Sequence, residues 1–354
     1  MKLLVAPLNW GLGHASRCIP LVRQHLAAGD EVVLGGDGDS LLLLRRHFPD
    51  LRVLPLAPLR LTYSAGSSQV LAMLRALPKI VASSFRDHRL LNCYLKAEHF
   101  DLVISDNRFG LFSRQTKCVY ITHQLHILLP RPWQWMSPFV SRLHAVVYRH
   151  FAEVWVPDTP YHTLSGILGT PVSSQPPIRY IGSLSRFAEY GDDASRVVRT
   201  AKANTDSRFA GYDVVAVLSG LEPQRTLLEE HILKRYAHSQ ERVLVVQGKP
   251  DRPATCLSHA NITLVPHLSD TDLAAALLSA RHIIARSGYS TIMDFSALGL
   301  LPCTNPLKRV ELIPTPGQPE QEYLARICTK AEYATSVFCA TIYGNDTATT
   351  RQRD

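Results

Sequence analysis

Several features that define whole classes of proteins are missing from this sequence. No apolar run approaches the roughly 20 residues that a membrane-spanning helix needs, and Pro7 and Asn9 interrupt the apolar start before a secretion signal would be complete. The seven cysteines include no CxxC pair, which argues against a disulfide framework or a zinc site. Lys and Arg form no blocks, and no nucleic-acid-binding motif is present. We expect a cytoplasmic protein that does not bind nucleic acid.

The composition is that of a chain with large buried cores. Hydrophobic residues make up 46% of the 354 residues and charged residues 19%, which is enough apolar surface for two domains. The formal net charge of +8 is spread along the chain. A basic protein of this kind suits anionic partners, either small substrates such as nucleotide diphosphates or an anionic membrane surface.

The order of strand-like and helical segments predicts an α/β fold of two Rossmann-like halves. Apolar runs alternate with helical segments from the N-terminus, as expected for buried parallel strands. A Pro- and Ser-rich stretch at 171–186 separates two such series, and a late strand of the second series is expected at 300–305. We expect two parallel sheets facing across a cleft. The expected domains are an acceptor domain at 1–175, a donor domain at 176–335 and a polar tail at 336–354.

The loop after the first strand, GLGHASR at 11–17, carries the first candidate site. Gly11 and Gly13 let the backbone approach a ligand closely, and the helix N-terminus behind them attracts anions. His14 lies where that helix end would keep an imidazole neutral, which is the form that a general base needs. His14 could instead cap the helix, and Arg17 could either contact phosphate or form a structural salt bridge.

Two further loops of the first half should meet this loop at the same edge of the sheet. Asp106 ends one strand, and it could hydrogen-bond His14, fix its tautomer and stabilise the imidazolium. His123 ends the next strand and is the rival base. Asp106 could also merely cap the helix that follows it.

In the second half, two loops are predicted to seat a phosphate. Ser219 and Gly220 precede a helix that carries Arg225 in its first turn. The other loop offers backbone donors, two hydroxyls and one guanidinium, and its residues are Arg286, Ser287, Gly288, Ser290 and Thr291. Asp294, one turn further along the next helix, would then face a ribose.

A rigid turn at 314–323, PTPGQPEQEY, leads into a helix that presents Gln318, Glu320 and Gln321. Hydrogen-bonding side chains on a stiff loop suit sugar hydroxyls. The same residues could instead cap the helix.

Two competing kinds of site have weaker support. DGD at 37–39 and DTD at 270–272 resemble a metal-binding DxD motif, but each precedes a predicted helix, where Asp is favoured as a cap. A dinucleotide site would use Asp37, but Ser16 stands where the third glycine of its fingerprint is expected. We therefore expect no metal and no bound cofactor.

Four motifs, in this order, resemble the GT-B glycosyltransferases of family 28, the MurG-like transferases, over most of the chain: GLGHASR, LSGLEPQRT, ARSGYSTIMDFSALG and PTPGQPEQEYLA. The resemblance implies that the second half binds a UDP-sugar. The diphosphate would lie at 286–290, the ribose at Asp294 and the sugar at 318–321. The backbone around Val265 to Leu268, which includes His267, would hold the uracil.

The same resemblance implies an inverting, metal-independent transfer. Helix dipoles and Arg286 would stabilise the departing diphosphate while His14 deprotonates the acceptor hydroxyl. The donor sugar would be a hexose or an N-acetylhexosamine, and the acceptor a glycan or lipid-linked molecule of the cell envelope. GxGHxxR at 11–17 also resembles the UDP-sugar hydrolase of pseudaminic acid synthesis, in which water is the acceptor. A nucleotide-sugar-binding protein without activity is the third alternative.

Family-28 enzymes often use lipid-linked acceptors, and two segments would suit a peripheral contact with the inner face of a membrane. Residues 70–97 and 127–148 mix apolar side chains, Trp133 and Trp135 among them, with Lys and Arg. Such mixtures are compatible with an anionic bilayer surface. They are equally compatible with core helices and with a loop over the acceptor cleft.

Overall fold

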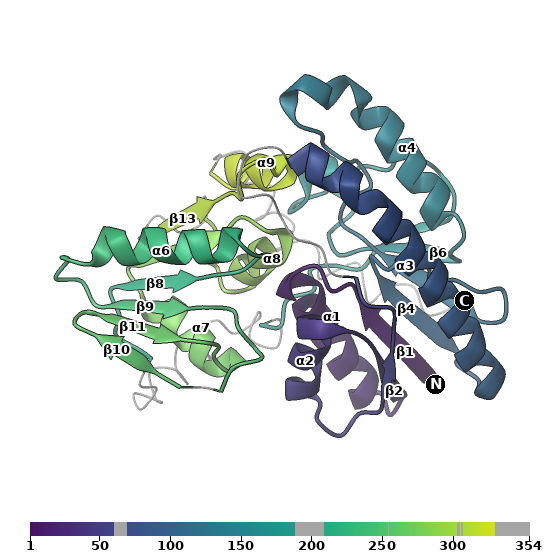
Figure 1. Cartoon of the computed structure of the whole chain (residues 1–354), viewed down its shortest axis with the longest axis horizontal. Coiled ribbons are helices and arrows are strands. Elements are labelled where there is room, and N and C mark those ends of the chain that lie inside the picture. The colour runs from purple at the N-terminus through teal and green to yellow at the C-terminus, as the bar shows by residue number, and fades with distance from the viewer. Residues whose placement is uncertain (60–68, 188–208, 254, 303–304, 306, 330–354) are drawn as a thin grey trace, which may run out of the picture.

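The computed structural model describes residues 1–59, 69–187, 209–253, 255–302, 305 and 307–329, with side chains described from residue 75 onwards in the helix at 69–97. Two sheets lie side by side, each with helices packed against it (Figure 1). The purple-to-teal half of the picture is the N-terminal half of the chain, and the green-to-yellow half is the C-terminal half.

The first sheet has parallel strands in the order β3-β2-β1-β4-β5-β6-β7 in the described part of the chain. The strands are β1 (Lys2–Pro7), β2 (Glu31–Gly36), β3 (Val53–Pro55), β4 (Leu102–Asp106), β5 (Lys117–Ile121), β6 (Glu153–Val156) and β7 (Ile178–Tyr180). The helical segments of this half are α1 (Leu12–Ala27), α2 (Gly38–His47), α3 (Gln69–Ala97), η1 (Arg131–Met136), α4 (Ser137–Tyr148) and η2 (Gly166–Gly169). Among the described residues, no helix has both the length and the hydropathy to cross a bilayer.

The second sheet has the order β10-β11-β9-β8-β12-β13, and β10 is antiparallel to its neighbour β11 while the other pairs are parallel. The strands are β8 (Val214–Val217), β9 (Val243–Val246), β10 (Leu257–His259), β11 (Ile262–Val265), β12 (His282–Arg286) and β13 (Arg309–Ile313). The helices are α6 (Gln224–Tyr236), α7 (Asp270–Ser279), α8 (Tyr289–Ala297) and α9 (Pro319–Ile327).

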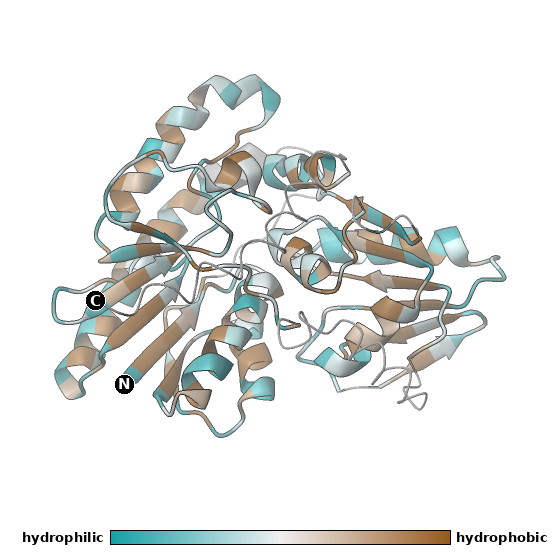
Figure 2. Ribbon diagram, turned by 180° about the vertical axis from the view of Figure 1, so that it is seen from behind, coloured by the Kyte–Doolittle hydropathy of each residue, from teal (hydrophilic) through white to brown (hydrophobic). Residues whose placement is uncertain are grey.

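Continuous apolar runs form the central strands, because helices cover both faces of a parallel sheet. Leu3, Leu4 and Val5 of β1 are fully buried, and Val243 to Val246 of β9 are buried throughout. Figure 2 shows these strands as brown arrows between helices of mixed colour. Each sheet reverses its strand order once, between β1 and β4 and between β8 and β12. Ligands of such sheets bind at the carboxyl ends of the strands beside the reversal.

The α/β fold expected from the sequence is confirmed, with differences in detail. The strand expected at 300–305 is wrong for its described residues: Leu300 and Leu301 are buried without forming a strand, and Pro302 has no backbone N–H for a ladder. The strand that pairs with β12 is β13, at Arg309–Ile313. The first sheet also takes its last strand, β7, from beyond the boundary expected after residue 175. The expected tail at 336–354 lies outside the described residues.

Candidate active site

A cavity of about 1260 Å³ lies between the two halves. Its walls come from the loops after β1 and β5 on one side and from the loops after β8, β11, β12 and β13 on the other. The residues expected at the site that line this cavity are Gly11, Gly13, His14, Arg17, His123, Ser219, Gly220, His267, Leu268, Gly288, Ser290, Thr291, Asp294, Gln318, Glu320 and Gln321. The expected residues that do not line it are Asp106, Arg225, Arg286 and Ser287.

His14 and Asp106 form a hydrogen-bonded pair on the first-half wall. His14 lies in the first turn of α1, and Asp106 is the last residue of β4. The Nδ1 atom of His14 lies 2.8 Å from Oδ1 of Asp106, so the hydrogen bond expected from the sequence is present. An ionised carboxylate can only accept, so its hydrogen bond with His14 requires the ring proton on Nδ1, and the Nη2 atom of Arg17, which can only donate, then lies beside Nδ1 without a hydrogen bond to it. The lone pair is then on Nε2, and 15% of the His14 side chain is exposed.

Arg17 holds the same carboxylate. Its Nε donates to Oδ2 of Asp106 over 2.5 Å and its Nη2 donates to Oδ1, with both side chains buried. Nη2 also lies 2.8 Å from Nδ1 of His14, which puts a full positive charge beside the imidazole. The salt bridge that was one of the two roles open to Arg17 from the sequence is present, and Arg17 also lines the cavity.

The charges around this pair keep the acid ionised and the base neutral. Burial raises the pKa of Asp106, but Arg17 and His14 outweigh it and lower that pKa to about 2. Burial and the charge of Arg17 hold the pKa of His14 below its ordinary value, against the opposite effect of Asp106. At neutral pH the pair is a carboxylate beside a neutral imidazole, which is the state that a general base requires.

His123, the rival base, has both ring nitrogens engaged. Its Nδ1 lies 3.1 Å from Nη1 of Arg17, which can only donate, so the ring proton is on Nε2. Nε2 donates to Oε1 of Glu320 over 2.7 Å. The ring also stacks on Tyr289, with the two centroids 4.2 Å apart. This arrangement leaves no free lone pair on His123 and favours His14 as the base.

The starts of two helices meet inside the cleft. α1 begins beside Gly13, and α8 begins after its N-cap Gly288. The Ser290 hydroxyl in the first turn of α8 donates to the Gly13 carbonyl over 2.8 Å. A Cβ atom on Gly13 would come within 2.9 Å of the Ser290 Oγ, so the contact needs a glycine. The free N–H groups at helix starts attract anions, and both helix starts line the cavity.

Arg286 was expected in the cleft, but the structure does not place it there. Its side chain is buried, and its Nη1 donates to the carbonyls of Pro314, over 3.0 Å, and Ile313, over 3.5 Å. Its Nη2 donates to the carbonyl of Gln224 over 2.7 Å. Backbone carbonyls therefore hold the guanidinium behind the loop, away from a diphosphate at the start of α8. The side chain of the neighbouring Ser287 is also buried.

The other expected donor residues have partners of their own. Asp294 lines the cavity, but its Oδ1 accepts from the Ser185 hydroxyl over 2.7 Å and its Oδ2 accepts from Nε of Arg186 over 3.3 Å. Burial raises the pKa of Asp294, and these two partners offset part of that rise. Gln321 uses its Oε1 to accept from the Thr315 backbone N–H over 2.8 Å, which stabilises the turn before α9.

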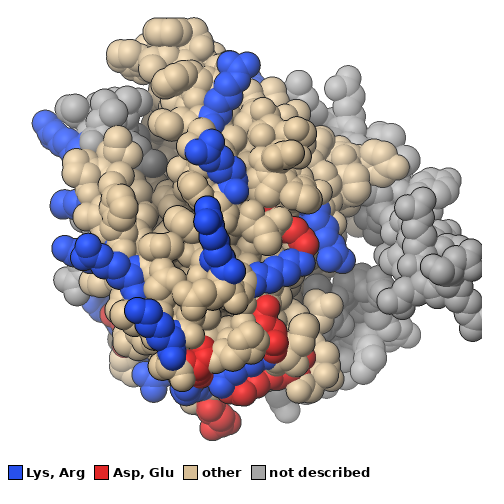
Figure 3. All heavy atoms as spheres, turned by 90° about the vertical axis from the view of Figure 1, so that its right-hand side faces the viewer, with Lys and Arg blue, Asp and Glu red and all other residues tan. Residues whose placement is uncertain are grey.

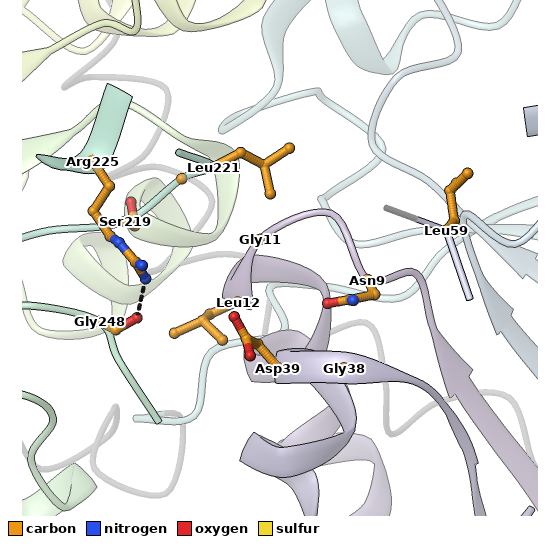
Figure 4. A pocket seen from close by; sticks show the side chains of 11 residues that line it. Asn9, Gly11, Leu12, Gly38, Asp39, Leu59, Ser219, Leu221, Arg225 and Gly248 are labelled. Atoms are coloured by element: carbon orange, nitrogen blue, oxygen red, sulfur yellow. Dashed lines mark hydrogen bonds between the residues drawn. The ribbon is translucent and has the colours of Figure 1, made fainter. Parts of the chain in front are cut away.

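A smaller cavity of about 330 Å³ adjoins the main one and shares Ser219 and Gly220 with it. In Figure 4 the loop after β1 and the start of α2 lie on one side of it, and the loop after β8 lies on the other. Arg225 lines this smaller cavity, where it donates to the Gly248 carbonyl over 2.7 Å and to Glu222. Its charge is therefore balanced within its own loop.

Basic side chains around His267 were not expected from the sequence. Arg23, Arg46 and Arg186 line the cavity. Arg46 of α2 reaches across to contact Nε2 of His267, and Arg23 of α1 donates to Asp270 over 3.1 Å. These arginines belong to no motif, and only the docking of the two halves brings them to the cleft.

Two of the residues that a metal site or a dinucleotide site would use are already bound to other side chains. Asp37 accepts from the buried Arg108 and from Asn9, so its carboxylate is already engaged. Asp270 pairs with Arg23. Within the described ranges, no group of three or more His, Cys, Asp and Glu side chains is arranged to hold a metal ion.

Two proteins of similar sequence are both named as glycosyltransferases. No known protein-family profile matches it. It is 28% identical over 173 residues to an uncharacterized glycosyltransferase of Methanosarcina mazei, in a match that covers 45% of this chain and less than half, 44%, of that protein. It is 25% identical over 316 residues to an uncharacterized glycosyltransferase of Methanosarcina acetivorans, covering 85% of this chain and 76% of that protein.

Solved structures are similar over nearly the whole chain. The spinosyn rhamnosyltransferase SpnG, complexed with thymidine diphosphate, has a TM-score of 0.53 at 15% identity, with 97% of this chain and 92% of that one covered. The UDP-GlcNAc 2-epimerase of Neisseria meningitidis, bound to UDP-GlcNAc, has a TM-score of 0.54 at 12% identity, with 95% and 94% covered. The fold is GT-B. An epimerase is among the structures of similar fold, so the fold alone does not fix the reaction.

The GT-B cleft also has an apolar wall in the first half. The loop after β5, η1 and α4 line it with Ile127, Leu128, Leu129, Met136, Val140 and Leu143. Leu77 of α3 and Trp133 of η1 line it too, with 53% and 47% of their surface still exposed. Exposed apolar side chains that gather in a cleft mark a binding surface.

Proposed function

We propose that this chain is a glycosyltransferase of the family-28 type that moves a hexose or an N-acetylhexosamine from a UDP-sugar to a glycan or lipid-linked acceptor. One observation carries the proposal. His14, which is hydrogen-bonded to the buried Asp106, lines the same cavity as the start of α8, and the contact of Gly13 with Ser290 joins the two over 2.8 Å. A proton acceptor next to an anion site is what a single displacement at an anomeric carbon requires.

In this mechanism the acceptor hydroxyl gives its proton to Nε2 of His14 while its oxygen bonds to the anomeric carbon. The bond from that carbon to the diphosphate oxygen breaks, and the electron pair leaves with UDP. Asp106 stabilises the imidazolium, and the N–H groups at the start of α8 stabilise the departing diphosphate. Transfer occurs with inversion and uses no metal. Arg286 acts indirectly, because it fixes the loop before α8.

The donor and acceptor classes have separate support. The two solved structures reported above hold thymidine diphosphate and UDP-GlcNAc, which favours a nucleoside-diphosphate sugar. The base would lie near His267 and Leu268, and the sugar near Gln318 and Glu320. The apolar wall favours an organic acceptor over water as the acceptor, because an organic acceptor would remove these apolar side chains from solvent and water would not.

We also propose a peripheral contact with an anionic bilayer at the cytoplasmic face. Figure 3 shows Lys and Arg in a row on the side of α3 and α4, over a surface that is mostly uncharged in its upper part and carries acidic side chains toward its lower end. Exposed basic side chains in the described part of α3 include Lys79, Arg86 and Arg89, and Asp87 in the same segment is buried. Phe85 and Phe139 are 68% and 62% exposed on the same two helices. Basic and apolar side chains together bind anionic lipid surfaces.

The test is a panel of nucleotide sugars assayed for nucleotide release, with and without a crude lipid and glycan extract. We expect release from a UDP-sugar that depends on the extract. Equal release without any acceptor would instead identify a UDP-sugar hydrolase. Binding of UDP without release from any donor would identify a non-catalytic nucleotide-sugar-binding protein.

A further inference from the structure

The hydrogen bonds around His14 continue into the other half of the molecule. Asp106 accepts from Arg17 over 2.5 Å, Arg17 donates to His123 over 3.1 Å, and His123 donates to Glu320 over 2.7 Å. Glu320 belongs to the first turn of α9, and it lies 197 residues along the chain from His123. The first-half pair is therefore linked to a carboxylate that only the docked second half provides.

Glu320 is held firmly at this point. Its second carboxylate oxygen, Oε2, accepts from the side-chain amide of Gln124. Burial raises the pKa of Glu320, but His123, His14 and Arg17 outweigh it, so the pKa lies below its ordinary value. The carboxylate is ionised at neutral pH, and both of its oxygens point to the first half.

The charges of this network do not cancel. Arg17 contributes one positive charge, whereas Asp106 and Glu320 contribute one negative charge each. With both histidines neutral, the network carries one net negative charge in a largely buried site, where charges interact strongly. One added proton balances it. That is the number of protons that His14 takes from an acceptor hydroxyl.

We propose that Glu320 is a positioning residue that completes the general base from across the domain interface. It holds His123 and Arg17 in place, and its charge balances the proton that His14 receives. The proposal rests on the proposed function and deepens it. Without Glu320, the charges of Arg17 and Asp106 sum to zero, and the proton that His14 receives loses one of the negative charges that stabilise it.

The titratable groups around His14 and its partners, within the described ranges, have places in this scheme. They come from α1, β4, β5, the loop after β5, α8 and α9, and they are Arg17, Cys18, Asp106, Tyr120, His123, Tyr289 and Glu320. Burial raises the pKa of Cys18 and of Tyr289 well above their ordinary values, so both stay neutral. Glu320 is therefore the charge that separates the docked arrangement from the first half alone.

The test compares Glu320→Gln with Glu322→Gln. The first variant keeps the shape and the acceptor oxygen for His123 but removes the charge. The second removes the same charge from an exposed position in the same helix. The pKa of His14 is followed by NMR titration of histidine-labelled protein, with the signal assigned by its loss in His14→Gln. Nucleotide release is measured across the same pH range.

We expect the pKa of His14 to fall by about one unit in Glu320→Gln, because a nearby negative charge is lost. It should not change in Glu322→Gln. The acidic limb of kcat/KM should move to lower pH by the same amount, and kcat should fall about tenfold. An unchanged His14 pKa in Glu320→Gln, or a variant that only raises the KM for the donor, overturns the inference. A shifted pKa in a protein that releases no nucleotide from any donor would overturn the proposed function and leave this inference standing.

Discussion

The Ser290 hydroxyl donates to the Gly13 carbonyl across the cleft, so the start of α8 touches the loop that carries His14. The contact joins residues 277 positions apart in the chain. It sets the distance between the proposed base and the proposed diphosphate site.

Gly13→Ala is expected to lower kcat/KM by about 100-fold, because a misplacement near 1 Å can cost that much. The new methyl group would lie 2.9 Å from the Ser290 Oγ and would push the two helix starts apart. The double variant Gly13→Ala/Ser290→Ala should recover part of the loss, since the crowding oxygen is gone. Nucleotide release measures both. A double variant that is as impaired as the product of the two single effects would contradict this steric coupling.

His14→Ala should reduce kcat by at least about 100-fold, because general base catalysis contributes about that much or more. Donor affinity, measured by calorimetry with UDP, should stay nearly intact, since the proposed diphosphate contacts come from α8. His99→Ala is the matched control, because the His99 side chain is 77% exposed on the first half. Equal activity of His14→Ala and wild type would remove His14 from the mechanism.

The pKa of Asp106 also predicts how stability depends on pH. The folded-state pKa of about 2 lies below the unfolded value near 3.9. Asp106 therefore adds about 2 kcal/mol to the free energy of unfolding at neutral pH, and this share is lost as the pH falls from about 4 to 2.

Urea unfolding of Asp106→Asn tests this. The variant leaves the buried Arg17 without its counter-charge, so we expect a loss of about 3 to 5 kcal/mol at pH 7. The difference from wild type should narrow below pH 4. The exposed Asp251→Asn serves as control. A difference that stays constant from pH 7 to pH 3 would show that Asp106 does not titrate as the structure implies.

The sequence was sufficient for the parts of the site that are local. Gly13 and His14 follow a buried strand, and Asp106 ends another, so their meeting at one sheet edge follows from parallel topology. The pairing of His14 with Asp106 was expected on that ground and is observed at 2.8 Å.

The parts that depend on long side chains and on domain docking were beyond the sequence. Arg286 ends β12 within a motif that predicts a phosphate site, but its side chain is long enough to bind the carbonyls of Ile313, Pro314 and Gln224 instead. The link between His123 and Glu320 joins the two halves and has no local pattern. The strand expected at 300–305 was wrong for a different reason, because buried apolar residues need not pair with a neighbouring strand.

Binding to anionic vesicles should depend on the basic face of α3. We expect wild type to sediment with phosphatidylglycerol vesicles at low salt and to be released as the salt rises. Lys79→Glu/Arg86→Glu should lose most of this binding. Arg45→Glu/Lys234→Glu makes the same charge change at exposed positions on α2 and α6. Equal binding by the two double variants would show that α3 is not the lipid-facing side.

The guanidinium of Arg286 binds the carbonyls of two separate stretches of backbone, Gln224 in one and Ile313 and Pro314 in the other. A variant in which the turn before α9 is exchanged to change the transferred sugar must therefore keep the backbone position that Arg286 holds. The main chain must still pass Arg286 at 313–314. A graft that ignores this anchor would unseat the start of α6 along with the turn.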